Sequence, residues 1–306
     1  SLPLSLYIDP EKPAVFFSPT HYSPRFAFCP RIIAIMDLSY IRFPEMFTKK
    51  DLYQLQHWTS YSVKKADKII TISNFSKSEI IDYYQISAER ILVTYPGYDK
   101  DKYKKLEIIN KINLLKIKKK YQIEGEYILF VGTLQPRKNL IRLIEAFKKV
   151  KTGVLKGKPL QLVISGKKGW LYREIFAKVK QFGLESDVVF SGYTDPRDLP
   201  DLYRHALCLV NPSLYEGFGI PVVEAMACGC PVIVSRTSSL PEVAGQAGIY
   251  IDPGNVSDIA EKILSVIKMS NKERRKIIQK GLNQVEKFNW ENCAQETLAV
   301  LKEAVI

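Results

Sequence analysis

Short runs of β-branched and aromatic residues alternate with longer segments of helical apolar spacing from residue 126 to residue 288. A parallel sheet with crossover helices requires this alternation, so the sequence predicts an α/β domain. The expected strands are residues 127–131, 160–165, 188–191, 206–210, 231–235 and 248–251. The expected helices are residues 140–150, 171–182, 199–205, 221–228, 258–269 and 272–288. Ligands of such sheets bind beyond the carboxyl ends of the strands, so we look for chemistry in the loops that follow them.

The first hundred residues repeat the pattern with fewer strands. Strands are expected at residues 14–17, 32–35, 68–72 and 91–93, and helices at residues 49–65 and 76–84. These strands are too few for a doubly wound sheet. We therefore expect the second half of a domain whose first half is not part of this sequence. A last helix is expected from Trp290 to Val305, and core packing is one explanation of Trp290.

The length of 306 residues and the 46% hydrophobic content allow two buried cores, because domains average roughly 150 residues. No apolar run approaches the ~18 residues that span a bilayer, and the N-terminal residues lack the pattern of a secretory signal peptide. We therefore expect a cytoplasmic protein.

The net charge of +13 favours phosphate-bearing partners. Much of this charge lies in residues 101–120, where eight lysines and two acidic residues are interleaved with leucine and isoleucine, including Ile108 and Ile109. A solvated amphipathic helix and a membrane-surface helix both fit this pattern. Nucleic acid is disfavoured, because no stacking aromatics or binding motif accompany the lysines.

The cysteines and histidines do not suggest a metal site. The five cysteines are an odd number, and only Cys228 and Cys230 are close together, in a C-x-C spacing rather than C-x-x-C. The three histidines show no ligand spacing. We expect buried, reduced thiols and no bound metal.

The segment from Phe130 to Asn139 (FVGTLQPRKN) leads from a strand into a helix. Its glycine lets a ligand approach the backbone, Asn139 can cap the helix, and the amides of a helix start favour an anion. Arg137 and Lys138 add two positive charges that suit a diphosphate. An ordinary capped helix with two surface cations is the alternative.

A second segment, from Pro212 to Gly229, reads PSLYEGFGIPVVEAMACG. Pro221 suits the first helical position and Gly229 the residue after the helix, so a short helix is expected between them. Glu216 precedes this helix and Glu224 lies within it, so both carboxylates are expected to border one site and to accept hydrogen bonds from sugar hydroxyls.

Two other interpretations of this segment compete. The glycines could simply mark turns, with the glutamates as partners of the helix dipole. Alternatively, Glu216 and Glu224 could be the acid and nucleophile of a glycoside hydrolase, although such a pair needs no phosphate-binding turn.

The Pro212–Gly229 segment closely resembles the E-x7-E signature of glycosyltransferase family 4, and the 130–139 segment resembles that family's phosphate-binding turn. Further similar stretches are Ile35 to Ser39, Thr71 to Ser76, Tyr95 to Asp99, and Ser239 to Val243. The resemblance covers nearly all of the sequence. It implies a retaining enzyme of the GT-B fold, with two Rossmann-like domains facing across a cleft and the start of the N-terminal domain missing.

The resemblance also implies the domain organisation. Residues 1–105 would be the C-terminal part of the acceptor-side domain, and residues 106–125 a connector. Residues 126–288 would bind the nucleotide sugar, and residues 289–306 would form a helix that crosses back to the first domain.

The site residues carry over position by position. Arg137 and Lys138 would neutralise the donor diphosphate, Glu216 would hold the transferred sugar, and Glu224 would hold the ribose. The amides of the loop would bind phosphate and sugar, and no metal or other cofactor would be needed. The remaining donor-site residues implied are Gly132, Thr133, Gly217, Phe218 and Gly219.

This sequence departs from the family at Met36, where a histidine is common before the aspartate. Methionine cannot carry a proton, so His21 is a candidate substitute and Asp37 a second acceptor-side candidate. The expected function is transfer of a hexose, mannose or glucose, to a glycan or lipid-linked acceptor, with membrane contact through the basic surface. An inactive nucleotide-sugar-binding module and a salt-sensitive binder of phosphate-rich polymers or membranes are the alternatives. The nucleotide, the acceptor and the oligomeric state are not predicted.

Overall fold

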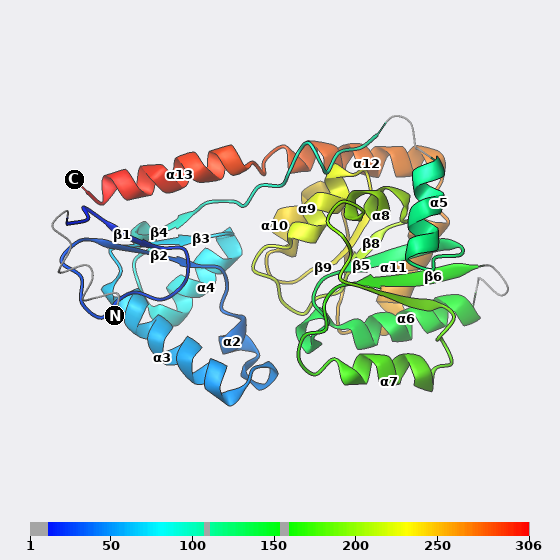
Figure 1. Ribbon diagram of the computed structural model, residues 1–306, viewed down its shortest axis with the longest axis horizontal. Helices are drawn as coiled ribbons and strands as arrows, with labels where there is room; N and C mark the ends of the chain where they lie inside the picture. The colour runs from blue at the N-terminus through cyan, green and yellow to red at the C-terminus, as the bar shows by residue number, and fades with distance from the viewer. Residues whose placement is uncertain (1–11, 107–110, 154–158, 306) are drawn as a thin grey trace. The chain divides into compact units, whose positions relative to one another are not determined.

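The computed structural model describes residues 12–106, 111–153 and 159–305. The chain divides into two compact units, shown in Figure 1. The first contains Ser1–Gly97, Glu216–Phe218 and Phe288–Ile306, and the second contains Tyr98–Tyr215 and Gly219–Lys287. The second unit therefore includes helix α5 (Lys111–Lys120), in the stretch expected to be a connector. Ile108 and Ile109 of the lysine-rich segment lie outside the described residues.

The second unit contains a six-stranded parallel sheet in the order β10-β9-β8-β5-β6-β7. Counted within the unit, this is the doubly wound order 3-2-1-4-5-6, which reverses between β5 and β8. The strands are β5 (Glu126–Val131), β6 (Leu160–Ser165), β7 (Val188–Gly192), β8 (Leu209–Asn211), β9 (Val232–Ser235) and β10 (Gly248–Ile251). The α/β architecture expected from the sequence is confirmed.

Helices cover both faces of this sheet (Figure 1). One layer contains α7 (Arg173–Gln181), α6 (Leu140–Thr152) and α11 (Val256–Ile267). The other contains α8 (Leu199–His205), α9 (Ile220–Ala227), α10 (Leu240–Ala244) and α12 (Asn271–Val285). The apolar positions of α6 recur at helical spacing and pack into the core, as at Leu140, Leu143, Ile144 and Phe147.

In the second unit, the start of one strand was predicted three residues too early. The expected strand 206–210 is β8, which begins only at Leu209, because Ala206 is the C-cap of α8 and the next two residues bring the chain to the sheet. The Leu207 amide still donates to the Tyr127 carbonyl at 2.8 Å. An apolar run alone therefore did not separate the approach to the strand from the strand itself.

The first unit contains four parallel strands in sequential order, β1 (Phe16–Ser18), β2 (Arg31–Ile35), β3 (Lys68–Thr71) and β4 (Ile91–Val93). Helices α3 (Lys49–Lys65) and α4 (Asn74–Tyr84) connect successive strands. Because connections between adjacent parallel strands are right-handed, these helices lie on one face of the sheet. Residues Ile33, Ile69 and Ile80 belong to the core on that face.

Helix α13 (Trp290–Glu303) packs on the other face of the same sheet. Its Val300 is buried against Ile32 and Ile70, which alternate along β2 and β3 with the residues of the opposite face. A sheet covered on both faces needs apolar residues at every position, which explains the unbroken isoleucine-rich strands of this unit.

The final helix was predicted, but the role of its tryptophan was not. Trp290 is 54% exposed, so core packing does not explain it. Phe288 is the buried aromatic residue, and its ring lies 5.2 Å from that of Phe218 and 5.8 Å from that of Tyr95. Within the described part of the chain, no helix is both long and apolar enough to cross a membrane.

Gly166, which follows β6, provides a test of the second unit. An added Cβ there would lie 1.8 Å from the Gly132 carbonyl oxygen, whereas at Gly183 it would meet nothing within 4 Å. Both glycines have positive φ, so both alanine variants carry backbone strain of roughly 1–2 kcal/mol. We expect Gly166→Ala to lower the free energy of unfolding by about 2 kcal/mol more than Gly183→Ala, as measured by urea denaturation. Equal losses would contradict the close approach of the two loops.

Candidate functional site

The loops that follow β5 and β8 leave the sheet at the position where the strand order reverses. In doubly wound sheets this position is the crevice that holds the ligand. The two loops are joined directly, since the Leu214 amide donates to the Arg137 carbonyl at 2.9 Å. The predicted phosphate-binding turn and the start of the predicted E-x7-E segment are thus neighbours within the second unit.

Asn139 does not cap α6, although the sequence suggested that it would. It adopts a left-handed conformation (φ 58°) and makes no side-chain cap. Instead its Nδ2 donates to the carbonyls of Pro212 (3.0 Å) and Pro253 (2.8 Å), and its Oδ1 accepts from Arg142. Asn139 therefore holds three loops together, while the first turn of α6 receives no side-chain cap.

The two predicted cations lie in a short 3₁₀ turn, η3 (Pro136–Lys138), directly before α6. The Arg137 guanidinium donates to the Tyr215 carbonyl at 2.5 Å, so this side chain also anchors the β8 loop. The Lys138 side chain passes beside Gly132, where its Cε lies 3.7 Å from the position that an added Cβ would take. Thr133, the next residue of the turn, is exposed.

Helix α9 places Glu224 in the second unit. The helix begins at Ile220, so Pro221 is within its first turn, and Gly229 (φ 74°) follows its end as predicted. Gly219 is its N-cap residue. The Glu224 carboxylate accepts a hydrogen bond from the Tyr203 hydroxyl at 2.9 Å.

Burial raises the pKa of Glu224, while hydrogen bonds from Tyr203 and Tyr103 act in the opposite direction. Because an ionised carboxylate can accept about four hydrogen bonds, two tyrosines leave acceptor capacity for ligand hydroxyls. The sequence analysis missed both tyrosines. A signal exists for Tyr203, which lies at a buried position of α8, because the hydroxyl of a buried tyrosine needs a hydrogen-bond partner.

Glu216, Gly217 and Phe218 belong to the first unit. The Gly217 carbonyl accepts from the Ser73 hydroxyl at 2.8 Å. A Cβ on Gly217 would lie 2.8 Å from the Met36 carbonyl oxygen, so only glycine fits at this approach. Phe218 is buried against Phe288, and Glu216 is 6% exposed. These contacts give Gly217 and Phe218 structural roles that the motif did not indicate.

The first unit brings His21 and Asp37 into electrostatic contact. Burial lowers the pKa of His21, and the Asp37 carboxylate partly opposes this shift. The imidazole is therefore neutral at pH 7. The His21 ring packs edge-on against Tyr22 at 4.5 Å, and Asp37 Oδ1 accepts from the Ser39 amide at 2.9 Å. Met36 exposes 40% of its surface beside this pair.

Two thiols of the second unit are buried, and one of them, Cys228, is in electrostatic contact with Glu224. Burial raises the pKa of Cys208 to about 12 and that of Cys228 further, so both are protonated at neutral pH. In the described residues, no group of three or more histidine, cysteine, aspartate or glutamate side chains is arranged to hold a metal ion.

Residues 114–284 match the family described as Glycosyl transferases group 1, which is more than half of the chain. The chain belongs to this family. Over 292 residues it is 33% identical to the O-antigen chain mannosyltransferase B of Escherichia coli, covering 95% of this chain and 74% of that protein. It is also 31% identical over 234 residues to the serotype-specific mannosyltransferase WbdA of Escherichia coli. That match covers 76% of this chain and 28% of WbdA.

The fold is that of GT-B glycosyltransferases, with two parallel-sheet, Rossmann-like halves. The crystal structure of WaaG, a glycosyltransferase involved in lipopolysaccharide biosynthesis, has a TM-score of 0.75 at 19% identity. This likeness covers 98% of this chain and 80% of WaaG. The family match and the mannosyltransferase relatives identify the chain as a glycosyltransferase of the hexosyltransferase class.

The tyrosines beside Glu224 provide a test that needs no ligand. Tyr203→Phe removes a hydrogen bond to a carboxylate, so we expect a loss of roughly 1.5–3 kcal/mol in the free energy of unfolding at pH 7. Losing this donor raises the pKa of Glu224 further and destabilises its charged form. The loss should therefore shrink as the pH falls through the raised pKa and the carboxyl group becomes protonated.

Tyr250→Phe is the matched control, because the Tyr250 hydroxyl donates to a neutral acceptor, the Gly245 carbonyl, at 2.6 Å. Its loss in urea denaturation should not change between pH 7 and pH 4.5. If the loss in Tyr203→Phe were equally independent of pH, the pairing with an ionised Glu224 would be wrong.

Proposed function

We propose that the chain transfers a hexose, with mannose the foremost candidate, from a nucleoside diphosphate sugar to a glycan or lipid-linked acceptor with retention of anomeric configuration. The named mannosyltransferase relatives support the sugar, and the O-antigen relative supports a role in polysaccharide assembly. The acceptor class also fits a cytoplasmic enzyme that contacts a membrane face.

The observation that carries this proposal is the position of Arg137 and Lys138. Both lie on the loop after β5, which is hydrogen-bonded to the loop after β8 where the strand order reverses. The sugar C1–O bond to the diphosphate breaks during transfer, and the departing nucleoside diphosphate takes the electron pair. Arg137 and Lys138 would stabilise that negative charge from fixed positions. The acceptor hydroxyl forms the new bond to C1, and its proton passes to a leaving phosphate oxygen.

The same cations support a reaction without a metal cofactor, because they supply positive charge where a divalent ion would otherwise be needed. The first turn of α6, which has no side-chain cap, adds backbone donors beside the diphosphate. The amides of Gly217 and Gly219 would bind phosphate and sugar, while Gly132 and Thr133 would line the donor site.

Glu224 would hold the ribose hydroxyls, with the two tyrosines fixing its carboxylate and leaving acceptor positions for the ligand. Glu216 would hold hydroxyls of the transferred sugar. On the acceptor side, neutral His21 with Asp37 beside it is suited to accept a hydrogen bond from an acceptor hydroxyl.

An inactive donor-binding module is the second candidate, because Met36 occupies a position where the family commonly has a histidine. Methionine there can neither move a proton nor donate a hydrogen bond. Such a module would bind a nucleoside diphosphate sugar without turning it over.

A thermal-shift screen with UDP, GDP, ADP and their sugar conjugates tests the donor site. A ligand that binds only the folded state raises Tm. At a free concentration of a hundred times its Kd, such a ligand adds about 2.7 kcal/mol to the free energy of unfolding. We expect one nucleotide and its conjugate to raise Tm selectively. A screen in which no nucleotide raises Tm would contradict the proposed donor site.

Three alanine variants separate the proposed roles. Glu224→Ala should weaken donor binding by roughly tenfold or more, measured by calorimetry, since it removes the ribose acceptor. Lys138→Ala should mainly lower the rate at which nucleoside diphosphate is released from the donor, by roughly 10²-fold.

Arg137→Ala should lower the same rate and also destabilise the fold, because Arg137 anchors the Tyr215 carbonyl. Lys138→Ala is therefore the cleaner variant, with Lys149→Ala on the exposed side of α6 as a charge-matched control. Unchanged donor affinity in Glu224→Ala would refute the ribose role. Full turnover in Lys138→Ala would refute the diphosphate role.

A further inference from the structure

Helix α5 (KINLLKIKKK) contains five lysines and no acidic residue. Two of its apolar side chains face solvent, since Ile112 is 65% exposed and Leu115 is 68% exposed. Large apolar side chains on an otherwise basic helix are not explained by solvation, which would favour polar residues at these positions.

Four of the exposed positions share one face of the helix. Residues 112, 115, 116 and 119 follow the spacing i, i+3, i+4, i+7, so Ile112 and Leu115 share a face with Lys116 and Lys119. Lys116 and Lys119 are both exposed. Ile117, on a different face, is 6% exposed, and α5 packs against α8.

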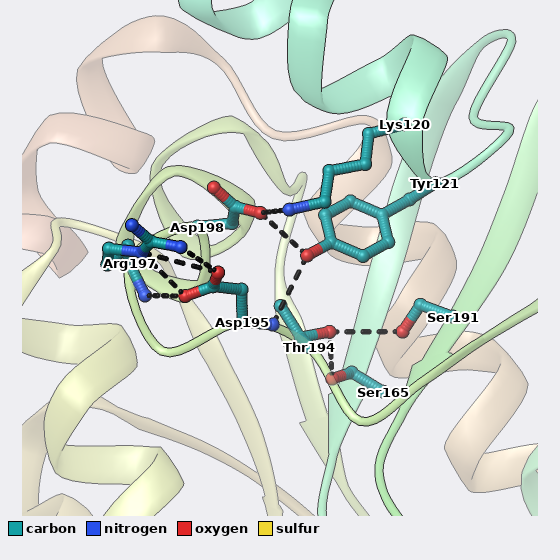
Figure 2. Close-up of polar contacts among 8 residues, drawn as sticks. All are labelled: Lys120, Tyr121, Ser165, Ser191, Thr194, Asp195, Arg197 and Asp198. Atoms are coloured by element: carbon teal, nitrogen blue, oxygen red, sulfur yellow. Dashed lines mark hydrogen bonds and ion pairs between the residues drawn. The ribbon is translucent and has the colours of Figure 1, made fainter.

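A polar network fixes α5 to the second unit at its C-terminal end (Figure 2). The Asp198 carboxylate accepts from Lys120 Nζ at 2.5 Å and from the Tyr121 hydroxyl at 2.7 Å. The Tyr121 hydroxyl in turn accepts from the Asp195 amide at 3.2 Å, and the Asp195 carboxylate is paired with Arg197. The network therefore holds the C-terminal end of the helix through Lys120, which neighbours Lys116 at i+4, and it does not include the side chains of Ile112 and Leu115.

Further positive charge adjoins the helix. A hollow of about 310 Å³ beside Asn113 is lined by Lys105, Arg204 and Arg274. Arg204 is engaged with the Asp201 carboxylate and the carbonyls of Lys102 and Lys104, so this hollow is not itself a built anion site. It extends the basic surface around α5.

We propose that α5 docks this protein onto a bilayer containing anionic phospholipids, with Ile112 and Leu115 in the interface and Lys116 and Lys119 beside the lipid phosphates. Charge complementarity supports this occupant, because a basic face attracts an anionic bilayer and the apolar side chains gain by entering it. A nucleic acid has no apolar region in which the two aliphatic side chains could be buried, and the helix has no aromatic residue on which bases could stack. The inference rests on the membrane contact in the proposed function and does not depend on the donor site.

Co-sedimentation with vesicles tests this surface. The vesicles contain phosphatidylcholine alone or phosphatidylcholine with phosphatidylglycerol. The protein should bind the anionic vesicles only. Lys116→Gln/Lys119→Gln should weaken binding by roughly fivefold per lysine, so about 25-fold in all. Ile112→Ser/Leu115→Ser should also weaken binding, and should do so even at salt concentrations that screen the lysines.

Two control variants match these changes elsewhere in the chain. Lys276→Gln/Lys280→Gln removes the same charge from exposed positions of α12, and Leu298→Ser/Val305→Ser removes exposed apolar side chains at the C-terminal helix. Both should bind anionic vesicles within about twofold of the unchanged protein.

The proposal would be overturned if the protein did not bind anionic vesicles, or if the α12 control weakened vesicle binding as much as the α5 lysine variant. Binding to a short RNA is measured alongside. The proposal would also be overturned if the α5 variants lost RNA binding but kept vesicle binding. The nucleotide thermal shift is measured in every variant. A preserved shift shows that the variant is folded with an intact donor site, so failure of the membrane proposal is distinguishable from failure of the proposed function.

Discussion

The hydrogen bond from the Leu214 amide to the Arg137 carbonyl joins the two loops on which the candidate site depends. These loops are neighbours because the strand order reverses between β5 and β8, so their helices leave toward opposite faces of the sheet. Side chains reinforce this backbone contact. Asn139 and Arg137 supply the bridges by donating to the carbonyls of Pro212 and Tyr215. The Arg137 guanidinium is therefore held by one of the contacts that join the two loops.

A second constraint comes from the burial of Glu224. Burial raises its pKa and makes its charged form costly, and the hydroxyls of Tyr203 and Tyr103 offset part of that cost. Tyrosine suits this task because it donates a hydrogen bond without adding a positive charge that would compete with a ligand. Keeping a charged carboxylate buried for a ligand therefore lowers the stability of this part of the fold, as is common at binding sites.

The sequence predicted the parallel sheet of the second unit because its strands and helices have distinct apolar periods and lengths, as in β6 and α8. It failed where side chains act over a distance. Asn139 is a residue type preferred at helix N-caps, yet its side-chain amide donates to loops more than 70 residues away along the chain. From the sequence, Tyr203 resembles an ordinary core residue, and only the structure shows that its hydroxyl donates a hydrogen bond to Glu224. The individual roles of Arg137, Lys138, Glu216 and Glu224 stay predictions, since they depend on a bound donor.

Local sequence patterns predicted the main elements of the first unit but not which helix covers the second face of its sheet. Its four strands run in sequential order, so the connecting helices α3 and α4 cover one face only. The other face is covered by α13, which follows it by about 200 residues in the chain, with Val300 buried against Ile32 and Ile70. The spacing of apolar residues in either segment does not indicate that the two segments pack together. The isoleucine-rich strands show that both faces are buried, but the helix that buries the second face is identified only by the folded chain.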